Sequence, residues 1–230
     1  MKSDEEQASG RQARRDRASR PPLSVERIAL CAIALADEEG LETLSMRRLA
    51  DRLGVEAMSL YHHVPSKAAL LQAMSDRLGA ALPVPAAGQW RGSLLAAAHA
   101  WRDLARQHPG AFPLLATRAT AGEALLDRTA ILVAGLQAAG FTPAASARAM
   151  SSFICSLNGY LLAAGAPALF RDLPEPAIDD YRFDEGRALL GDIPLEAWVL
   201  TSDAAFEFHV TMLLDGLQAA LERGAAATRC

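Results

Sequence analysis

The sequence predicts an all-α protein with a boundary at residues 81–88, on the strength of three observations. Hydrophobic residues make up 51% of the 230 residues but aromatic residues only 6%, a composition typical of helices rich in Ala and Leu. Long runs of β-branched residues are missing, and no Asn-Gly or Asp-Gly pair lies between two alternating segments, so hairpins are not predicted. The boundary segment, ALPVPAAG, contains two prolines and a glycine, which end helices.

Residues 1–22 are polar, begin acidic, and then carry five arginines around a single acid, Asp16, before two prolines. The arginines are Arg11, Arg14, Arg15, Arg17 and Arg20. This composition predicts a disordered basic arm. Two interpretations stay open: a solvated tail, or an arm that lies along a phosphate backbone or in a minor groove.

The first helix is predicted to begin after Ser24, a suitable N-cap, and to end at Gly40. Its inward positions are Val25, Ile28, Ala32 and Leu35. Cys31 also lies in this helix. We expect it to be a small core residue and not a redox sensor, because no second thiol is close to it in the sequence.

Residues 45–63, SMRRLADRLGVEAMSLYHH, predict two short helices joined by a tight turn. Ser45 can cap the first of them, whose apolar residues recur at the spacing of one helix face. These residues are Met46, Leu49, Ala50 and Leu53. Gly54 can adopt the positive φ that lets the next segment leave at a steep angle. The pattern is that of a helix-turn-helix.

The second of these helices, predicted from 56 to about 63, has an outer face that is poor in charge and rich in contact groups. Leu60 turns inward, which leaves Ala57, Met58, Ser59, Tyr61 and His62 outside. Small residues let a helix backbone enter the major groove, and hydroxyl and aromatic groups reach phosphates and thymine methyls. This face therefore predicts DNA recognition.

The run LxxxSMRRLADRLGVEAMSLYHHVPSKAALL resembles the DNA-binding domain of TetR-type (TetR/AcrR) transcriptional regulators over roughly residues 23–82. Its most specific parts are LADRLGV, SLYHHV and SKAALL. The resemblance implies an N-terminal three-helix helix-turn-helix DNA-binding domain over 23–82, with its connecting helix. It also implies a helical effector-binding and dimerisation domain over 89–224.

The resemblance further implies the DNA contacts of particular residues. Arg47 would approach a base or phosphate, and Lys67 a phosphate from the start of the following helix. Ala57, Met58 and His62 would be the reading positions. The full expected set is Ser45, Arg47, Arg48, Ala57, Met58, Ser59, Tyr61, His62, His63 and Lys67. His62 stands where a larger aromatic is common and Met46 where a small hydroxyl residue is common, and these departures bear on which bases are read.

After Pro65, Ser66 can cap a connecting helix with Leu70, Leu71, Met74 and Leu78 inward. Beyond the boundary, helices are predicted over 90–107, a short piece to about 118, 122–139, from Pro143 onward, and about 195–222. Residues 149–170 carry no charge and could by length cross a bilayer. We expect no membrane span, because serines, Asn158, glycines and Pro167 make the segment too polar and too broken.

The segment 171–194 is acidic and contains prolines, which predicts a mobile loop. Its acids, Asp179, Asp180, Asp184 and Glu185, could be a cation site. They lack the alternating ligands and glycine of a calcium loop, so a solvated charge run is favoured and neither a metal nor a cofactor is predicted.

The leading functional hypothesis is a homodimeric repressor that leaves a palindromic double-stranded DNA operator when a small-molecule effector binds. Ligand sensing is implied by the resemblance, and an apolar or amphipathic effector is expected. The residues that could line its cavity are Trp101, Phe112, Met150, Phe153, Asn158 and His99, for which ordinary core packing is the alternative. Dimerisation is expected through the helices at about 143–164 and 195–222, which carry a surplus of apolar and small residues.

Two alternative functions are a regulator that responds to a partner protein and a helical enzyme or carrier. The enzyme hypothesis is disfavoured because the chain has no phosphate loop, no Gly-x-Ser-x-Gly and no His-Glu-x-x-His. His62 and His63 project about 100° apart on a helix and cannot chelate one metal. Three widely spaced cysteines and an N-terminus without the apolar core of a signal peptide favour the cytoplasm.

Overall fold

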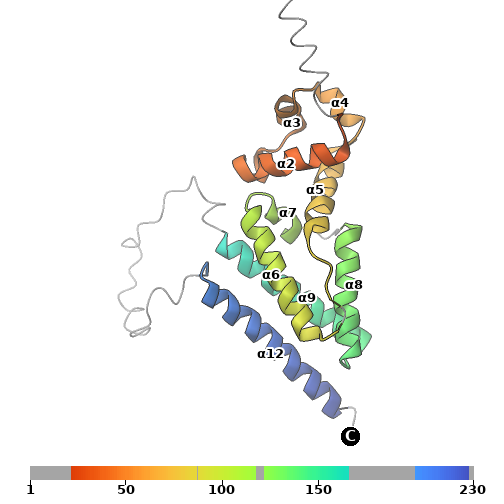
Figure 1. Cartoon of the computed structure of the whole chain (residues 1–230), viewed down its shortest axis with the longest axis vertical. Helices are drawn as coiled ribbons and strands as arrows, with labels where there is room; N and C mark the ends of the chain where they lie inside the picture. The colour runs from red at the N-terminus through yellow and green to blue at the C-terminus, as the bar shows by residue number, and fades with distance from the viewer. Residues whose placement is uncertain (1–21, 87, 118–121, 166–199, 228–230) are drawn as a thin grey trace, which may run out of the picture.

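The computed structural model describes residues 22–86, 88–117, 122–165 and 200–227, and these ranges are helical with turns and no strand. The all-α prediction is confirmed for them. Helices α2 (Val25–Glu39), α3 (Met46–Leu53) and α4 (Ala57–Tyr61) form one end of an elongated molecule (Figure 1). Helix α5 (Lys67–Ala81) runs from this end to the body, which contains the remaining helices.

The three predicted serine caps of the N-terminal unit are confirmed. The hydroxyls of Ser24, Ser45 and Ser66 each accept a hydrogen bond from the backbone N–H three residues later, at 3.2, 3.3 and 3.1 Å. Gly40 and Gly54 end α2 and α3 with φ angles of 90° and 67°, as expected of glycines at helix ends. A short 3₁₀ helix, η1 (Leu41–Thr43), was not predicted.

Helix α4 is shorter than predicted, because it ends at Tyr61 and not at about residue 63. His62 and His63 form a turn that leads to Pro65. A proline disfavours helical backbone at the residue before it, so Val64 leaves the helix and packs into the core instead, where it is buried. The core of this unit also buries residues of every other helix at this end, including Ile28, Leu49, Leu60 and Leu70.

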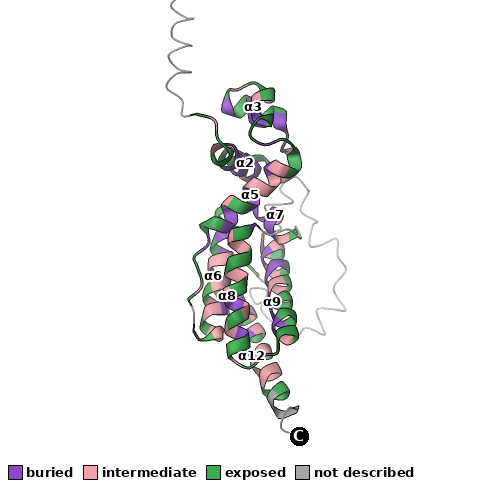
Figure 2. Cartoon of the chain, turned by 90° about the vertical axis from the view of Figure 1, so that its right-hand side faces the viewer, coloured by how far each residue is buried: buried purple, intermediate pink, exposed green. Residues whose placement is uncertain are grey.

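The body consists of α6 (Trp90–Gln107), α7 (Phe112–Thr117), α8 (Glu123–Ala138), α9 (Pro143–Ala164) and α12 (Asp203–Ala227). Buried residues of these helices form one hydrophobic core, and some of them can be seen on α6, α8 and α9 in Figure 2. The start of α12 is fixed to α6 by Arg102, which is buried, donates to Asp203 at 2.6 Å and lies 4.3 Å above the ring of Phe206. The hydrogen bond from Arg102, followed by one from Arg106, lowers the pKa of Asp203 below its ordinary value.

The connecting helix α5 is anchored to the body by Arg128 of α8. Its guanidinium donates to the carbonyl oxygen of Leu82 at 2.9 and 2.7 Å and to that of Ala80 at 3.3 Å. A cation at the C-terminus of a helix is favoured by the helix dipole, and here it also satisfies carbonyl groups that lack helical partners. Gly79 packs closely on the Leu125 side chain beside this contact.

Within the described ranges, none of the helices is long and apolar enough to cross a membrane. The same ranges contain no group of three or more His, Cys, Asp or Glu side chains placed to hold a metal ion. Cys31 is partly buried against the core, and burial raises the pKa of its thiol. The basic arm up to residue 21, the acidic segment 171–194 and the predicted helical turns at 195–199 lie outside the described residues.

Two glycine substitutions are expected to change stability in opposite directions. Gly54→Ala places a Cβ in left-handed backbone and lowers the free energy of unfolding by about 1 kcal/mol. Gly92→Ala in α6 meets open space and removes a flexible residue from a helix, which raises the free energy of unfolding by up to about 1 kcal/mol. Urea unfolding at equal protein concentration measures both, and equal effects of the two changes would contradict the turn geometry.

Candidate nucleic-acid interface

The side chains buried beneath α4 decide which of its residues face outward. Leu60 and Val64 are buried beneath it, and the amide of Val55 donates to the carbonyl of Ala50 at 3.1 Å, which closes the turn from α3. Met58 and Tyr61 consequently face outward, with exposed fractions of 69% and 41%. The two side chains are three residues apart on one helix face, so together they present an uncharged surface that a contact with another molecule could cover.

The arginines of α3 differ in their availability for DNA. Arg48 forms an ion pair with Glu39, and Arg52 forms one with Glu38 at 2.6 Å. Both pairs are largely exposed, so each contributes little to stability and can exchange with a phosphate. These pairs were not predicted, although the adjacent Glu38 and Glu39 at the end of the first helix were visible in the sequence.

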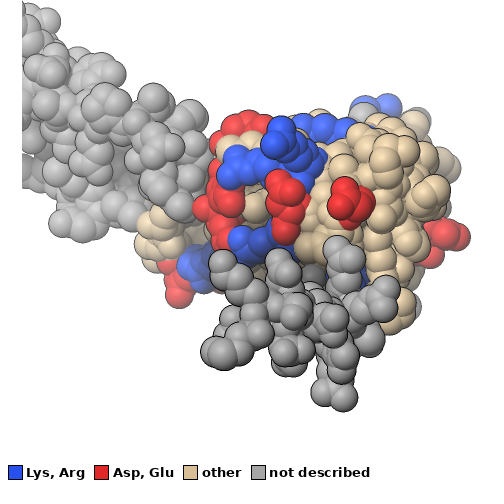
Figure 3. Space-filling view, turned by 90° about the horizontal axis from the view of Figure 1, so that it is seen from above, with Lys and Arg blue, Asp and Glu red and all other residues tan. Residues whose placement is uncertain are grey.

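Arg47 and Lys67 are the free cations beside α4: both are exposed, and neither forms an ion pair with another described residue. Seen from the α3–α4 end, Lys and Arg lie beside Asp and Glu on one part of the surface, and a broad part carries no charge (Figure 3). The face is thus only locally basic, in keeping with the net charge of −4 of the whole chain.

The remaining predicted DNA-binding residues divide by exposure. His62 and His63 are exposed, whereas Ala57 and Ser59 are partly buried, with Ala57 packed against the core. Ser45 is the N-cap of α3, so its hydroxyl already accepts the amide of Arg48. It can still donate its own proton to a phosphate.

The predicted effector residues are brought together only in part. Trp101 donates from Nε1 to Oδ1 of Asn158 at 2.7 Å, and its ring lies edge-on to that of Phe112 with centroids 5.8 Å apart. Met150 and Phe153 are buried in the same core. His99 lies elsewhere, against the ring of Phe206 on α12 and 3.4 Å from Glu207.

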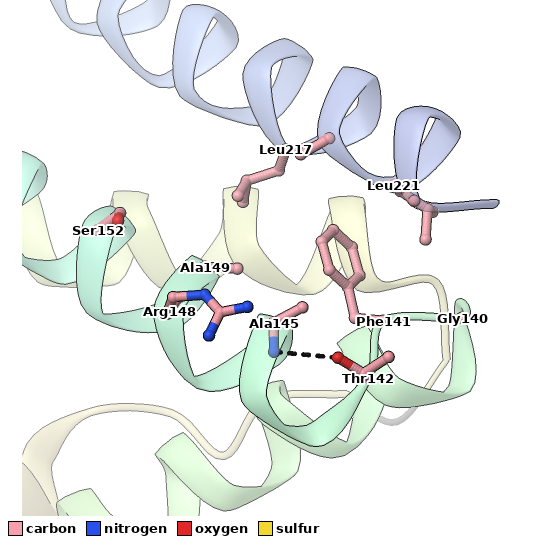
Figure 4. Close-up of a pocket in the computed structure, with 11 residues that line it drawn as sticks. Gly140, Phe141, Thr142, Ala145, Arg148, Ala149, Ser152, Leu217 and Leu221 are labelled. Atoms are coloured by element: carbon pink, nitrogen blue, oxygen red, sulfur yellow. Dashed lines mark hydrogen bonds between the residues drawn. The ribbon is translucent and has the colours of Figure 1, made fainter. Parts of the chain in front are cut away.

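A crevice of about 470 Å³ lies between the start of α9 and the end of α12, and none of the six predicted effector residues lines it. Figure 4 shows Phe141, Leu217 and Leu221 lining this space and Arg148 projecting into it. The hydroxyl of Thr142 is occupied as the cap of α9, since it accepts the amide of Ala145 at 3.3 Å.

Residues 31–74 match the family of bacterial regulatory proteins called the tetR family, and residues 82–221 match the tetracyclin repressor-like C-terminal domain. The chain belongs to the TetR family. The second match covers more than half of the sequence; the first match ends within α5 and the second begins directly after that helix.

Relatives of this TetR-family chain include proteins named as regulators. The HTH-type transcriptional repressor DrrR1 of Streptomyces coeruleorubidus is 34% identical over 165 residues, which are 70% of this chain and 60% of that protein. An HTH-type transcriptional regulator of Saccharopolyspora erythraea is 37% identical over 141 residues, 59% of this chain and 60% of that protein. The chain therefore spans about 60% of the length of these curated relatives.

The TetR fold is also seen in solved structures. A possible TetR family transcriptional regulator from Streptomyces coelicolor A3(2) is 31% identical and matches with a TM-score of 0.67, over 86% of this chain and 100% of that one. The helix-turn-helix inferred from the sequence pattern and the helical body are therefore both features of the family fold.

Proposed function

We propose that this TetR-family protein is a transcriptional repressor that binds a palindromic operator as a homodimer and leaves it when a small-molecule effector binds. The observation that carries the proposal is the outer face of α4, where Met58, Tyr61 and His62 are exposed beside the free cations Arg47 and Lys67. Uncharged side chains suit base edges in the major groove, and cations suit the flanking phosphates. The name of the DrrR1 relative supports repression as the direction of regulation.

In this proposal Met58, Ala57 and His62 read bases, and Tyr61, Ser59 and His63 bind the phosphate backbone. Arg48 joins them by exchanging Glu39 for a phosphate, and Ser45 donates its hydroxyl proton. The chain acts in the cytoplasm, where its DNA is. The absence of a membrane-spanning helix from the described residues is in keeping with that location.

Dimerisation is proposed through the outer faces of α9 and α12. On α12, Phe208 and Met212 lie one turn apart on the side opposite the core and are 68% and 59% exposed. On α9, the exposed side carries Ser151, Cys155 and Gly159 at helical spacing, small residues that let a second helix approach closely. Pairing with a second copy would bury this surplus of apolar and small groups.

The effector site is proposed in the body around Trp101, Phe112, Met150, Phe153 and Asn158. A polar pair, Trp101 and Asn158, lies there among apolar side chains, and such a pair can exchange its internal hydrogen bond for one to an amphipathic ligand. His99 would take part only if the ligand extends toward α12, since its ring packs on Phe206.

The experiment that tests the proposed function is selection of DNA from a random duplex pool by the purified full chain at about 50–200 mM salt, where phosphate contacts change affinity steeply. We expect enrichment of two inverted half-sites with centres about 34 Å apart, bound by two chains per duplex. The selected duplex then serves in titrations at several salt concentrations. Failure to enrich any sequence at low salt would refute a sequence-specific regulator.

A further inference from the structure

The turn between α6 and α7 holds the last turn of α2 through three contacts to one carboxylate. Oδ1 of Asp37 accepts hydrogen bonds from the backbone N–H groups of Gly110 at 3.1 Å and Ala111 at 2.9 Å. Oδ2 lies 2.8 Å from Nδ1 of His108. Asp37 and His108 are both partly buried, so water competes only weakly for these contacts. The carboxylate thus joins the DNA-binding unit to the body apart from the covalent connection through α5.

The two backbones approach so closely here that only glycine fits at position 110. A Cβ on Gly110 would overlap the carbonyl oxygen of Ala36 and lie 2.7 Å from the Cα of Asp37. The next residues of the body, Ala111 and Leu114, are buried in the same core as the helices of the DNA-binding unit. The turn is therefore packed into that unit, and the units cannot slide past each other here without breaking the contacts of Asp37.

Helix α7 continues from this turn into the core of the body. Phe112 is buried there against Trp101, and the carbonyl of Ala116 accepts from Nδ2 of Asn158 at 3.4 Å. This short helix therefore contributes to both cores: Leu114 and Leu115 pack in the core of the DNA-binding unit, and Phe112 and Ala116 pack in that of the body. These contacts form a continuous chain from the body core to the turn that Asp37 holds.

Helix α5 provides the other attachment of the DNA-binding unit, and its end is held by Arg128 of α8. Helices α7 and α8 both contact α5 and flank it (Figure 1). An attachment away from the axis of α5 restricts the angle of the DNA-binding unit more than contacts along α5 alone. In a dimer, this angle sets the separation and rotation of the two α4 helices, which must match half-sites about 34 Å apart.

We propose that Asp37 is a positioning residue for operator binding: by holding the α6–α7 turn it fixes the angle of the DNA-binding unit on the body, and so the half-site spacing that the dimer accepts. The inference rests on the proposed function, because it requires a dimer that binds two half-sites. It concerns a residue that does not touch DNA in this proposal and that was not among the predicted site residues.

The test compares the selected operator with duplexes whose half-sites are moved together or apart by one base pair. Each base pair rotates one half-site by about 34° and shifts it by about 3.4 Å. For the wild-type chain, we expect either change to lower the affinity at least about tenfold. For Asp37→Ala, we expect this discrimination to shrink to about threefold or less, because the α4 helices can follow the displaced half-sites. A purely stabilising role of Asp37 would lower affinity for all spacings alike.

Two variants serve as controls in the same titrations. Asp37→Asn keeps an oxygen that can face the amides of Gly110 and Ala111, so we expect it to retain the wild-type spacing preference. Asp103→Ala removes an exposed acid of α6 that pairs with no other described residue, so it controls for net charge. Its spacing preference is expected to be unchanged.

The inference is overturned if Asp37→Ala discriminates between spacings as the wild type does, or if Asp37→Asn loses the discrimination as Asp37→Ala does. If circular dichroism shows that Asp37→Ala does not fold, His108→Ala takes its place, since it removes the Oδ2 contact and leaves α2 intact. We expect His108→Ala to relax the preference in the same direction, and an unchanged preference overturns the inference equally. A wild-type chain that selects no operator would overturn the proposed function together with this inference.

Discussion

The double variant Tyr61→Ala, Lys67→Ala will lose at least about 30-fold in affinity for the selected operator, roughly 2 kcal/mol. Tyr61 is exposed at the end of α4, and Lys67 opens α5 as a cation without an ion pair among the described residues. Neither side chain contributes to the buried core, so the fold should survive. A dimer loses these contacts at both half-sites, so the loss in operator affinity is larger than for one half-site.

The salt dependence separates lost phosphate contacts from a general loss of binding. If each Lys67 neutralises one phosphate, Lys67→Ala alone should reduce the slope of log K against log salt by roughly 0.9 per half-site, or roughly 1.8 per dimer. Arg106→Ala removes the same charge from the exposed side of α6 and leaves Arg102 to hold Asp203, so the slope should be unchanged. Wild-type affinity of the folded double variant would remove the basis for placing α4 on DNA.

The double variant Phe208→Glu, Met212→Glu will convert the proposed dimer of 24.5 kDa chains into monomers. Each exposed apolar side chain buried in an interface contributes about 1.5–3 kcal/mol, and a two-fold axis duplicates both of them. Four carboxylates would also face one another across that axis, where like charges cost several kcal/mol. We therefore expect the dimer dissociation constant to rise at least about 1,000-fold, or roughly 4 kcal/mol.

Sedimentation at micromolar concentration measures this change. The matched control is Leu126→Glu, which places the same charge on an apolar side chain near the start of α8 that is 57% exposed. This variant should remain dimeric. A dimer that persists in the double variant, or dissociates equally in Leu126→Glu, would place the interface on another surface.

The ends of several helices could be predicted from the sequence, because they depend on residues close together in the chain. The caps of Ser24, Ser45 and Ser66, the left-handed Gly54 and the start of α9 at Thr142–Pro143 are each decided within a few residues, and each is confirmed. The apolar period of the first helices likewise predicted most of their buried faces, from Ile28 to Leu78, but it was wrong for Val25, which is 44% exposed in the first turn of α2, and Leu71 is only partly buried. The end of α4 was misplaced by about two residues because the effect of Pro65 on the preceding turn was underestimated.

The contacts between distant segments could not be predicted, because they depend on how the helices meet. Asp37 and His108 are 71 residues apart, Arg102 and Asp203 are 101 apart, and Arg128 reaches carbonyls 46 and 48 residues away. Nothing in the periodicity of one helix shows which polar side chain another helix will receive. The effector candidates illustrate this: His99 and Trp101 both lie in α6, yet His99 packs on Phe206 of α12 and Trp101 on Phe112 of α7.

The sequence by itself determined the helix-turn-helix and the chemistry of its outer face, since caps, a glycine turn and helical spacing act over one or two turns of the chain. Only the tertiary structure decided which cations beside α4 are free, where α7 enters the core of the DNA-binding unit, and that the carboxylate of Asp37 joins the two units. Those properties depend on distances between residues far apart in the sequence, and such distances are set when the apolar faces of all the helices are buried together.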